Sequence, residues 1–198
     1  MAVGDKQKLI TNILQEVLNQ KAEFSPDFNW FINKHTKENF KENFHIIDEI
    51  FKNLNGSISG YETKRITKLQ PDAYFGGNYN FIFEFDEFQH FSSFRKKTFE
   101  LYPQNLKLNF DKNQWIKACE TYSYQADKYR NSKKTKDFDF TGGRTAQRAY
   151  LDCFRDLLPV QHNLNPTLRL NEFEVIGIER LDKNSCKKIE QLITEKLK

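Results

Sequence analysis

The sequence is short of the features that mark membrane, secreted and zinc-binding proteins. Its 198 residues include only three cysteines, which are widely spaced and form no CxxC pair. That pattern argues against a zinc cluster and favours reduced thiols. No apolar run approaches the roughly 18 residues of a bilayer-spanning helix, and the first 20 residues lack the apolar core and cleavage site of a secretory signal. We therefore expect a cytoplasmic protein with no membrane segment.

Internal repeats and low-complexity linkers are also missing, and the length suits one domain. Phenylalanine, by contrast, is abundant: there are 19 Phe, and aromatic residues make up 15% of the chain, which predicts a core built on phenyl rings. The net charge of +4 is compatible with nucleic acid binding without being diagnostic of it.

Hydrophobic periodicity and turn residues predict a single α/β domain around one mixed sheet. Helices are expected at 5–20, 37–54, 92–102, 110–130, 145–158 and 183–198. Strands are expected at 61–70, in a hairpin formed by 72–75 and 79–88, and at 173–181. The domain then has four parts: N-terminal helices (1–56), a hairpin core with an acidic site (57–102), a helical insertion with a basic loop (103–160), and a late strand with a C-terminal helix (161–198).

Acidic residues are threaded through the most apolar strand, "FIFEFDEFQH" (81–90). Because side chains alternate between the faces of a strand, Phe81, Phe83 and Phe85 fall on one face, which must be buried. Glu84 and Asp86 fall together on the other face. The pattern therefore predicts two carboxylates side by side.

A third acid, Asp72, precedes the neighbouring hairpin strand and is expected to reach the same face. Clustered carboxylates repel and raise each other's pKa unless a positive charge lies between them. Mg²⁺ relieves that cost, typically with one or two carboxylates and substrate phosphate as ligands. Alternatively, these acids line a solvent-exposed face, with His90 at the strand end. The apolar flanks and the proline before Asp72 favour the cation site.

Pro71-Asp72, a hairpin turn and then "FIFEFD" resemble the PD-(D/E)XK signature of restriction-endonuclease-like nucleases. The longer string "FEFDEFQHFSSFR" is similar to the E-x-D-x-x-x-H strand end of nucleases related to very-short-patch repair endonucleases. The resemblance covers about residues 37–102, together with the expected strand at 173–181. It implies an αβββαβ core with a mixed sheet, to which this chain would add N-terminal helices and a helical insertion before the last strand.

The resemblance also implies a mechanism. Asp72 and Glu84 would hold Mg²⁺, for which Mn²⁺ would substitute, and Asp86 would be a third ligand or position the attacking water. His90 would act as general base or protonate the leaving oxygen. The family's lysine, however, falls at Asp86. Its positive charge would have to come from His90 or from one of three other residues: Lys68, Arg95 and Lys96.

The second half of the chain offers basic and polar residues for a nucleic acid. The segment "DKYRNSKKTK" predicts an exposed basic loop, "TGGRTAQR" an arginine-bearing helix start, and "HNLNPTLRL" a polar loop that precedes a strand. In each case an ordinary solvated surface is the alternative. The candidate contacts are Lys128, Arg130, Lys133, Lys134, Lys136, Arg144, Arg148, Asn165 and Arg169.

These observations favour a small Mg²⁺-dependent DNA endonuclease of restriction or phage defence, with RNA left open as a substrate. Specific double-strand cutting by so short a chain would call for a homodimer or a partner subunit that supplies targeting. Two alternatives remain: an inactive nuclease-like domain that binds nucleic acid or a partner protein, and a metallohydrolase with another substrate.

Overall fold

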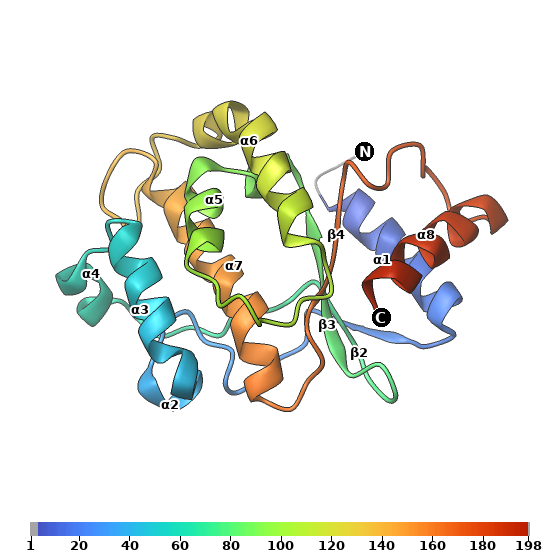
Figure 1. Ribbon diagram of the computed structural model, residues 1–198, viewed down its shortest axis with the longest axis horizontal. Helices are drawn as coiled ribbons and strands as arrows, with labels where there is room; N and C mark the ends of the chain where they lie inside the picture. The colour runs from blue at the N-terminus through green and yellow to red at the C-terminus, as the bar shows by residue number, and fades with distance from the viewer. Residues whose placement is uncertain (1–3, 198) are drawn as a thin grey trace.

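The computed structural model describes residues 4–197 and shows a four-stranded sheet between two helical layers (Figure 1). The strands are β1 (Ala22–Phe24), β2 (Ala73–Phe75), β3 (Phe81–Asp86) and β4 (Leu168–Asn171). They lie in the order β1-β2-β3-β4, with β2 antiparallel to both of its neighbours and β4 parallel to β3. The expected α/β class with a mixed sheet is confirmed.

Helices account for most of the remaining chain. They are α1 (Asp5–Leu18), α2 (Lys37–Phe40), the 3₁₀ turn η1 (Lys41–Asn43), α3 (Phe44–Asn53), α4 (Ile58–Thr63), the 3₁₀ turn η2 (Phe88–His90), α5 (Ser93–Glu100), α6 (Lys112–Lys128), α7 (Gly143–Gln161) and α8 (Lys183–Lys196). No helix within residues 4–197 is both long and apolar enough to cross a bilayer.

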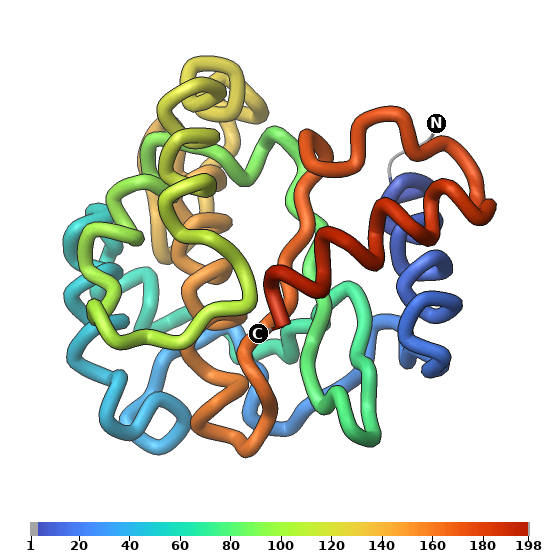
Figure 2. The backbone as a smooth tube through the Cα atoms, turned by 45° about the vertical axis from the view of Figure 1, so that its right-hand side comes forward, coloured from blue at the N-terminus to red at the C-terminus, as the bar shows by residue number. Residues whose placement is uncertain are grey.

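The helices α1 and α8 lie side by side and cover one face of the sheet (Figures 1 and 2). Phe81, Phe83 and Phe85 point into this layer, where they pack with residues of α1 and α8 such as Ile13 and Ile189. The alternation predicted for β3 is therefore confirmed, because its phenylalanine face is the buried apolar one.

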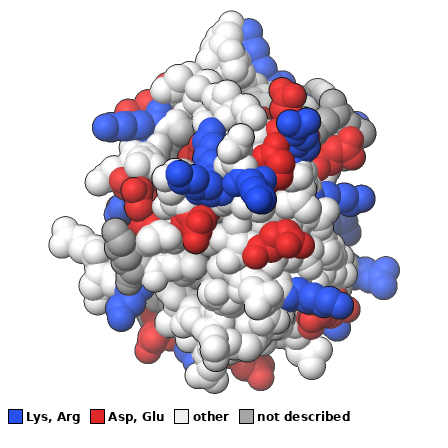
Figure 3. All heavy atoms as spheres, turned by 90° about the vertical axis from the view of Figure 1, so that its right-hand side faces the viewer, with Lys and Arg blue, Asp and Glu red and all other residues white. Residues whose placement is uncertain are grey.

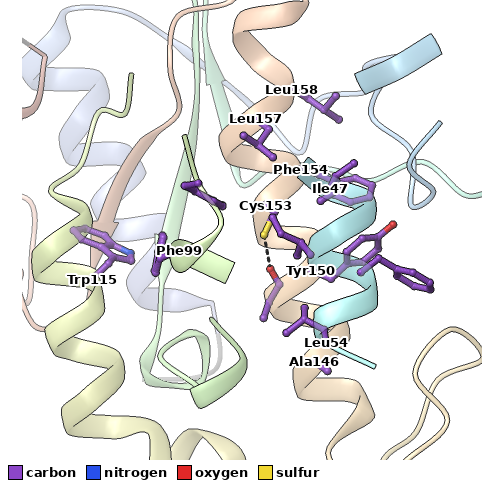
Figure 4. Packing of buried hydrophobic residues seen from close by; sticks show 14 of the residues in the cluster. Ile47, Leu54, Phe99, Trp115, Ala146, Tyr150, Cys153, Phe154, Leu157 and Leu158 are labelled. Carbon is purple, nitrogen blue, oxygen red and sulfur yellow. Dashed lines mark hydrogen bonds between the residues drawn. The ribbon is translucent and has the colours of Figure 1, made fainter. Parts of the chain in front are cut away.

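A second core lies on the other side of the sheet, among α2, α3, α5, α6 and α7. Figure 4 shows α7 at its centre, with Tyr150, Phe154 and Leu157 packed around α3. Cys153 is buried there, and its Sγ donates to the Ala149 carbonyl at 3.2 Å (Figure 4). Burial raises the pKa of this thiol to about 11, so it is an inert core residue.

Two predicted strands are wrong, and one predicted helix is interrupted. Residues 61–70 form no strand, because 58–63 are helical from an N-cap at Ser57, and only a single bridge pairs Ile32 with Lys68. Residues 173–181 form turns, with Ile176 67% exposed. The true outer strands are β1 and β4, and the predicted helix at 37–54 is divided into α2, η1 and α3.

Candidate active site

The sheet register places Asp72 and Glu84 next to each other. Ala73 pairs with Phe83 in the antiparallel β2–β3 ladder, so the next position outward sets Asp72 opposite Glu84. The Asp72 carboxylate reaches across, and its Oδ2 accepts from the Phe85 backbone N–H at 2.7 Å. Burial raises the pKa of Asp72, while the Phe85 N–H and the charge of Arg155 oppose that rise. The predicted pairing of these two acids is thus present.

Glu84 is a buried carboxyl group whose pKa is strongly raised. It is only 4% exposed. Burial raises its pKa to about 8, with the Arg155 charge opposing the shift and Asp72 reinforcing it. Glu84 Oε1 lies 2.7 Å from Arg155 Nε, yet neither atom makes a hydrogen bond. This buried oxygen is in contact with a cation but is not satisfied by it.

Asp86 has a different environment. Its Oδ2 accepts from Trp115 Nε1 at 2.7 Å, and its Oδ1 accepts from Arg169 at 2.7 Å. Both oxygens are therefore committed to buried donors. The expectation that Asp86 is a third metal ligand or positions a water finds no support in this geometry, and we leave it out of the cation site.

Arg169 lies at the centre of a buried ionic network. Besides Asp86 it contacts Asp156, which accepts from its Nε at 2.8 Å, and it donates to the Asp152 carbonyl at 3.2 Å. Arg169 is fully buried on β4. The prediction that it lies on a recognition loop is wrong, because its charge is consumed by the carboxylates of β3 and α7.

His90 joins the edge of this network from η2. Its Nδ1 lies 3.0 Å from Asp152 Oδ2 and 3.5 Å from Asp86 Oδ1, and its side chain is 20% exposed. Although burial works against it, the charges of His90 and Arg169 hold the pKa of Asp152 far below its usual range. Asp152 therefore stays ionised and fixes the orientation of the imidazole.

The three residues predicted to replace the missing lysine lie elsewhere. Lys68 is 3.4 Å from Asp27, and Lys96 pairs with Glu120 at 2.8 Å. Arg95 is buried and donates to Asp156 at 2.5 Å, so its charge serves the network and not the acid pair. The positive charge beside Glu84 comes from Arg155 of α7, which is not among the site residues predicted from the sequence.

A signal for Arg155 was present in the sequence. Arg148, Asp152 and Arg155 share one side of α7, so the helix has a polar side as well as an apolar one. In the structure this stripe faces the acids of β3, and Asp152 is buried. A polar helix side opposite an acidic strand face is thus the pattern that would have found it.

The residues proposed to contact nucleic acid divide by burial. Exposed ones lie in the loop after α6, among them Lys134, which is 3.4 Å from Asp139. Asn165 is exposed but donates to the Tyr79 carbonyl at 2.7 Å. Arg144 and Arg148 are half-buried on α7. The remaining exposed ones are Lys128, Arg130, Lys133 and Lys136.

Fold and site together define a mixed α/β protein with a partly unsatisfied carboxylate pair beside a paired ionic network. Within residues 4–197, no set of three or more His, Cys, Asp and Glu side chains is arranged to hold a metal ion. The chain belongs to the DUF7255 family, a family of unknown function, whose model matches residues 49–195. No curated protein and no solved structure matches the chain.

Proposed function

We propose that this protein is a Mg²⁺-dependent endonuclease that hydrolyses phosphodiester bonds in DNA, as in restriction or phage defence. The observation that carries the proposal is the cross-strand pairing of Asp72 with Glu84 at one end of the β2–β3 ladder. The element order supports it: α1, β1, β2 and β3 come in this order, with α2 to α4 inserted between β1 and β2, and helices and then β4 follow, which agrees with an αβββαβ core that carries an added helical segment.

The donor set suits a hard divalent cation. Both side chains offer carboxylate oxygens, which Mg²⁺ and Mn²⁺ prefer. Glu84 Oε1 is a buried oxygen without a hydrogen bond, and such an atom is costly unless a partner completes its environment. Asp72 and Glu84 would hold the ion, and water and substrate oxygens would fill its other positions. When bound, Mg²⁺ polarises the phosphoryl oxygen and lowers the pKa of a coordinated water.

Other residues would hold the metal donor in place, transfer a proton and bind the substrate phosphate. The Phe85 N–H holds the Asp72 carboxylate against the ladder, which fixes one donor in place. His90 uses Nδ1 toward Asp152, so Nε2 is the nitrogen that remains to take or give a proton near the solvent. Arg155 is positioned to leave Glu84 for a substrate phosphate, because a guanidinium pairs well with either anion.

The proposal is tested by nicking of supercoiled plasmid DNA in Mg²⁺. Asp72→Asn and Glu84→Gln should each abolish cutting, since each removes a charged oxygen donor while preserving shape. Glu87→Gln is the matched control: it removes one negative charge from the same strand end, where Glu87 accepts from Gln89 and takes no part in the pair. Undiminished cutting by the first two variants would contradict the assignment.

A second candidate function is a nuclease-like domain that binds nucleic acid without cutting it. The observation that favours it is Asp86, which stands where the nuclease pattern has a lysine and is fully committed to Trp115 and Arg169. Retardation of DNA in EDTA, with no nicking when Mg²⁺ or Mn²⁺ is added, would support this alternative over hydrolysis.

A further inference from the structure

The helix α7 is buried on every side except one. From Gly143 to Pro159 its side chains are buried at all positions but four, and those four are spaced 4, 3 and 4 residues apart, as expected for a single line along a helix. They are Arg144, Arg148, Leu151 and Arg155. We call Arg144, Arg148 and Arg155 the arginine stripe.

Two of the three arginines, Arg144 and Arg148, lack acidic partners. Among residues 4–197, neither Arg144 nor Arg148 has a carboxylate oxygen within 4.0 Å. Neutral groups hold them instead: Arg144 donates to Gln147 Oε1 at 2.6 Å, and Arg148 donates to the Gln89 carbonyl at 3.1 Å. These contacts orient the guanidiniums without neutralising them.

A further arginine joins them from the end of α6. The guanidiniums of Arg130 and Arg148 lie 5.2 Å and 5.6 Å from the centre of the same ring, that of Tyr129. Burial lowers the pKa of Arg148, Asp152 counteracts that effect, and the charges of Arg144 and Arg130 lower it further. Like charges held together in this way repel each other, and a bound anion would relieve that repulsion.

The arginine stripe runs alongside the proposed site residues. Arg148 donates a hydrogen bond to the carbonyl of Gln89, the neighbour of His90. Arg155, at one end of the stripe, lies in ion-pair contact with Glu84. A helix rises about 1.5 Å per residue, so Arg144 and Arg155 are about 16 Å apart along the axis. One strand of duplex DNA carries a phosphate about every 3.4 Å, so the stripe matches the length of about five nucleotides.

We infer that the arginine stripe, with Arg130 beside it, binds the phosphate backbone of one DNA strand and leads that strand to Asp72 and Glu84. The destination of the strand rests on the proposed function, whereas the backbone contact does not. Side chains that bind phosphates fix register and orientation and carry no sequence information. The stripe would therefore hold DNA irrespective of its sequence.

The opposite side of the molecule provides a matched comparison. The face that shows α1 and α8 carries basic and acidic side chains interspersed (Figure 3). On α8, Lys183 and Lys187 are exposed and lie about one turn apart. Replacing both by glutamine removes the same charge as replacing two arginines of the stripe, at a surface that the inference leaves free of DNA.

The experiment measures binding of a labelled DNA duplex in EDTA over a range of salt, from about 50 to 200 mM. The variant Arg144→Gln/Arg148→Gln should bind roughly tenfold more weakly and should reduce the salt slope by about two, one for each phosphate contact. Lys183→Gln/Lys187→Gln should bind like the wild type. Because Arg148 is half-buried, Arg130→Gln/Arg144→Gln is the second test, at more exposed positions, with folding checked by circular dichroism.

An unchanged affinity and salt slope in both arginine variants would overturn the inference. So would an equal loss in the α8 control, or a loss confined to Lys133→Gln/Lys134→Gln, which would assign binding to the exposed lysine loop. Asp72→Asn and Glu84→Gln should retain binding in EDTA. If these two variants still cut DNA while the arginine variants bind weakly, the proposed hydrolytic site fails and the stripe stands.

Discussion

The two faces of β3 solve the problem of burial in opposite ways, although their residues alternate along one strand. Phe81, Phe83 and Phe85 meet the side chains of α1 and α8, where removal of apolar surface from water is favourable by itself. Glu84 and Asp86 meet α7 and β4, where burial is unfavourable unless each charge finds a partner. The first face tolerates any good packing, whereas the second depends on specific partners.

A second contrast lies within the charged face. Asp86, Arg169 and Asp156 form a closed network, in which both carboxylate oxygens of each aspartate accept a hydrogen bond. Glu84, two residues away from Asp86, keeps a buried oxygen without a hydrogen bond. The closed end is a structural device that holds β4 on β3, and the incomplete end is the candidate for chemistry.

The largest expected effect on stability comes from Arg169→Met, which keeps the length of the side chain and removes its charge. Asp86 and Asp156 would be left buried without this partner, at a cost of about 3–5 kcal/mol in the free energy of unfolding. On the opposite face, Phe83→Leu should cost only about 1–2 kcal/mol, because an apolar side chain replaces another.

Urea unfolding of both variants measures this difference. A value for Arg169→Met equal to or below that for Phe83→Leu would show that the ionic face needs no specific partners and would remove the contrast between the two faces.

A smaller effect is expected from Glu84→Gln as the pH changes. With a pKa of about 8 in the folded chain against 4.5 for the ordinary group, Glu84 favours folding in its protonated form. This contribution is complete below the ordinary pKa and is lost as the pH rises through the folded-state value. Between about pH 5 and pH 8 the wild type should lose on the order of 3 kcal/mol that the variant keeps.

Thermal or urea unfolding in EDTA at several pH values provides the check. Glu84→Gln should gain stability relative to the wild type toward pH 8. Parallel curves for the two proteins would mean that Glu84 is ionised throughout, with Arg155 as its permanent partner.

Local sequence patterns predicted the parts of the fold that depend on neighbours in the chain. The two faces of β3 followed from strict alternation, and the hairpin turn brought Asp72 beside Glu84 as expected. The predicted helices at 92–102 and 110–130 are present as α5 and α6, and they begin at the N-caps Ser92 and Asp111, residue types that favour this position.

Two of the parts that failed depend on residues far apart in the chain. The segment 168–170 contains an arginine and follows an Asn- and Pro-rich stretch, so local patterns predict a loop. It is a buried edge strand in which Asp86 and Asp156 neutralise Arg169, and no local pattern reports such partners. Likewise Arg155 became part of the site through the packing of α7 on the sheet.

The most direct test of the central claim is a crystal structure of the protein soaked in Mn²⁺, with the anomalous signal used to locate the ion. We expect one manganese between the carboxylates of Asp72 and Glu84, with the Arg155 guanidinium moved off Glu84 and Asp86 still bound to Trp115 and Arg169. A map with no ion at this position, and with Arg155 still against Glu84, would contradict it.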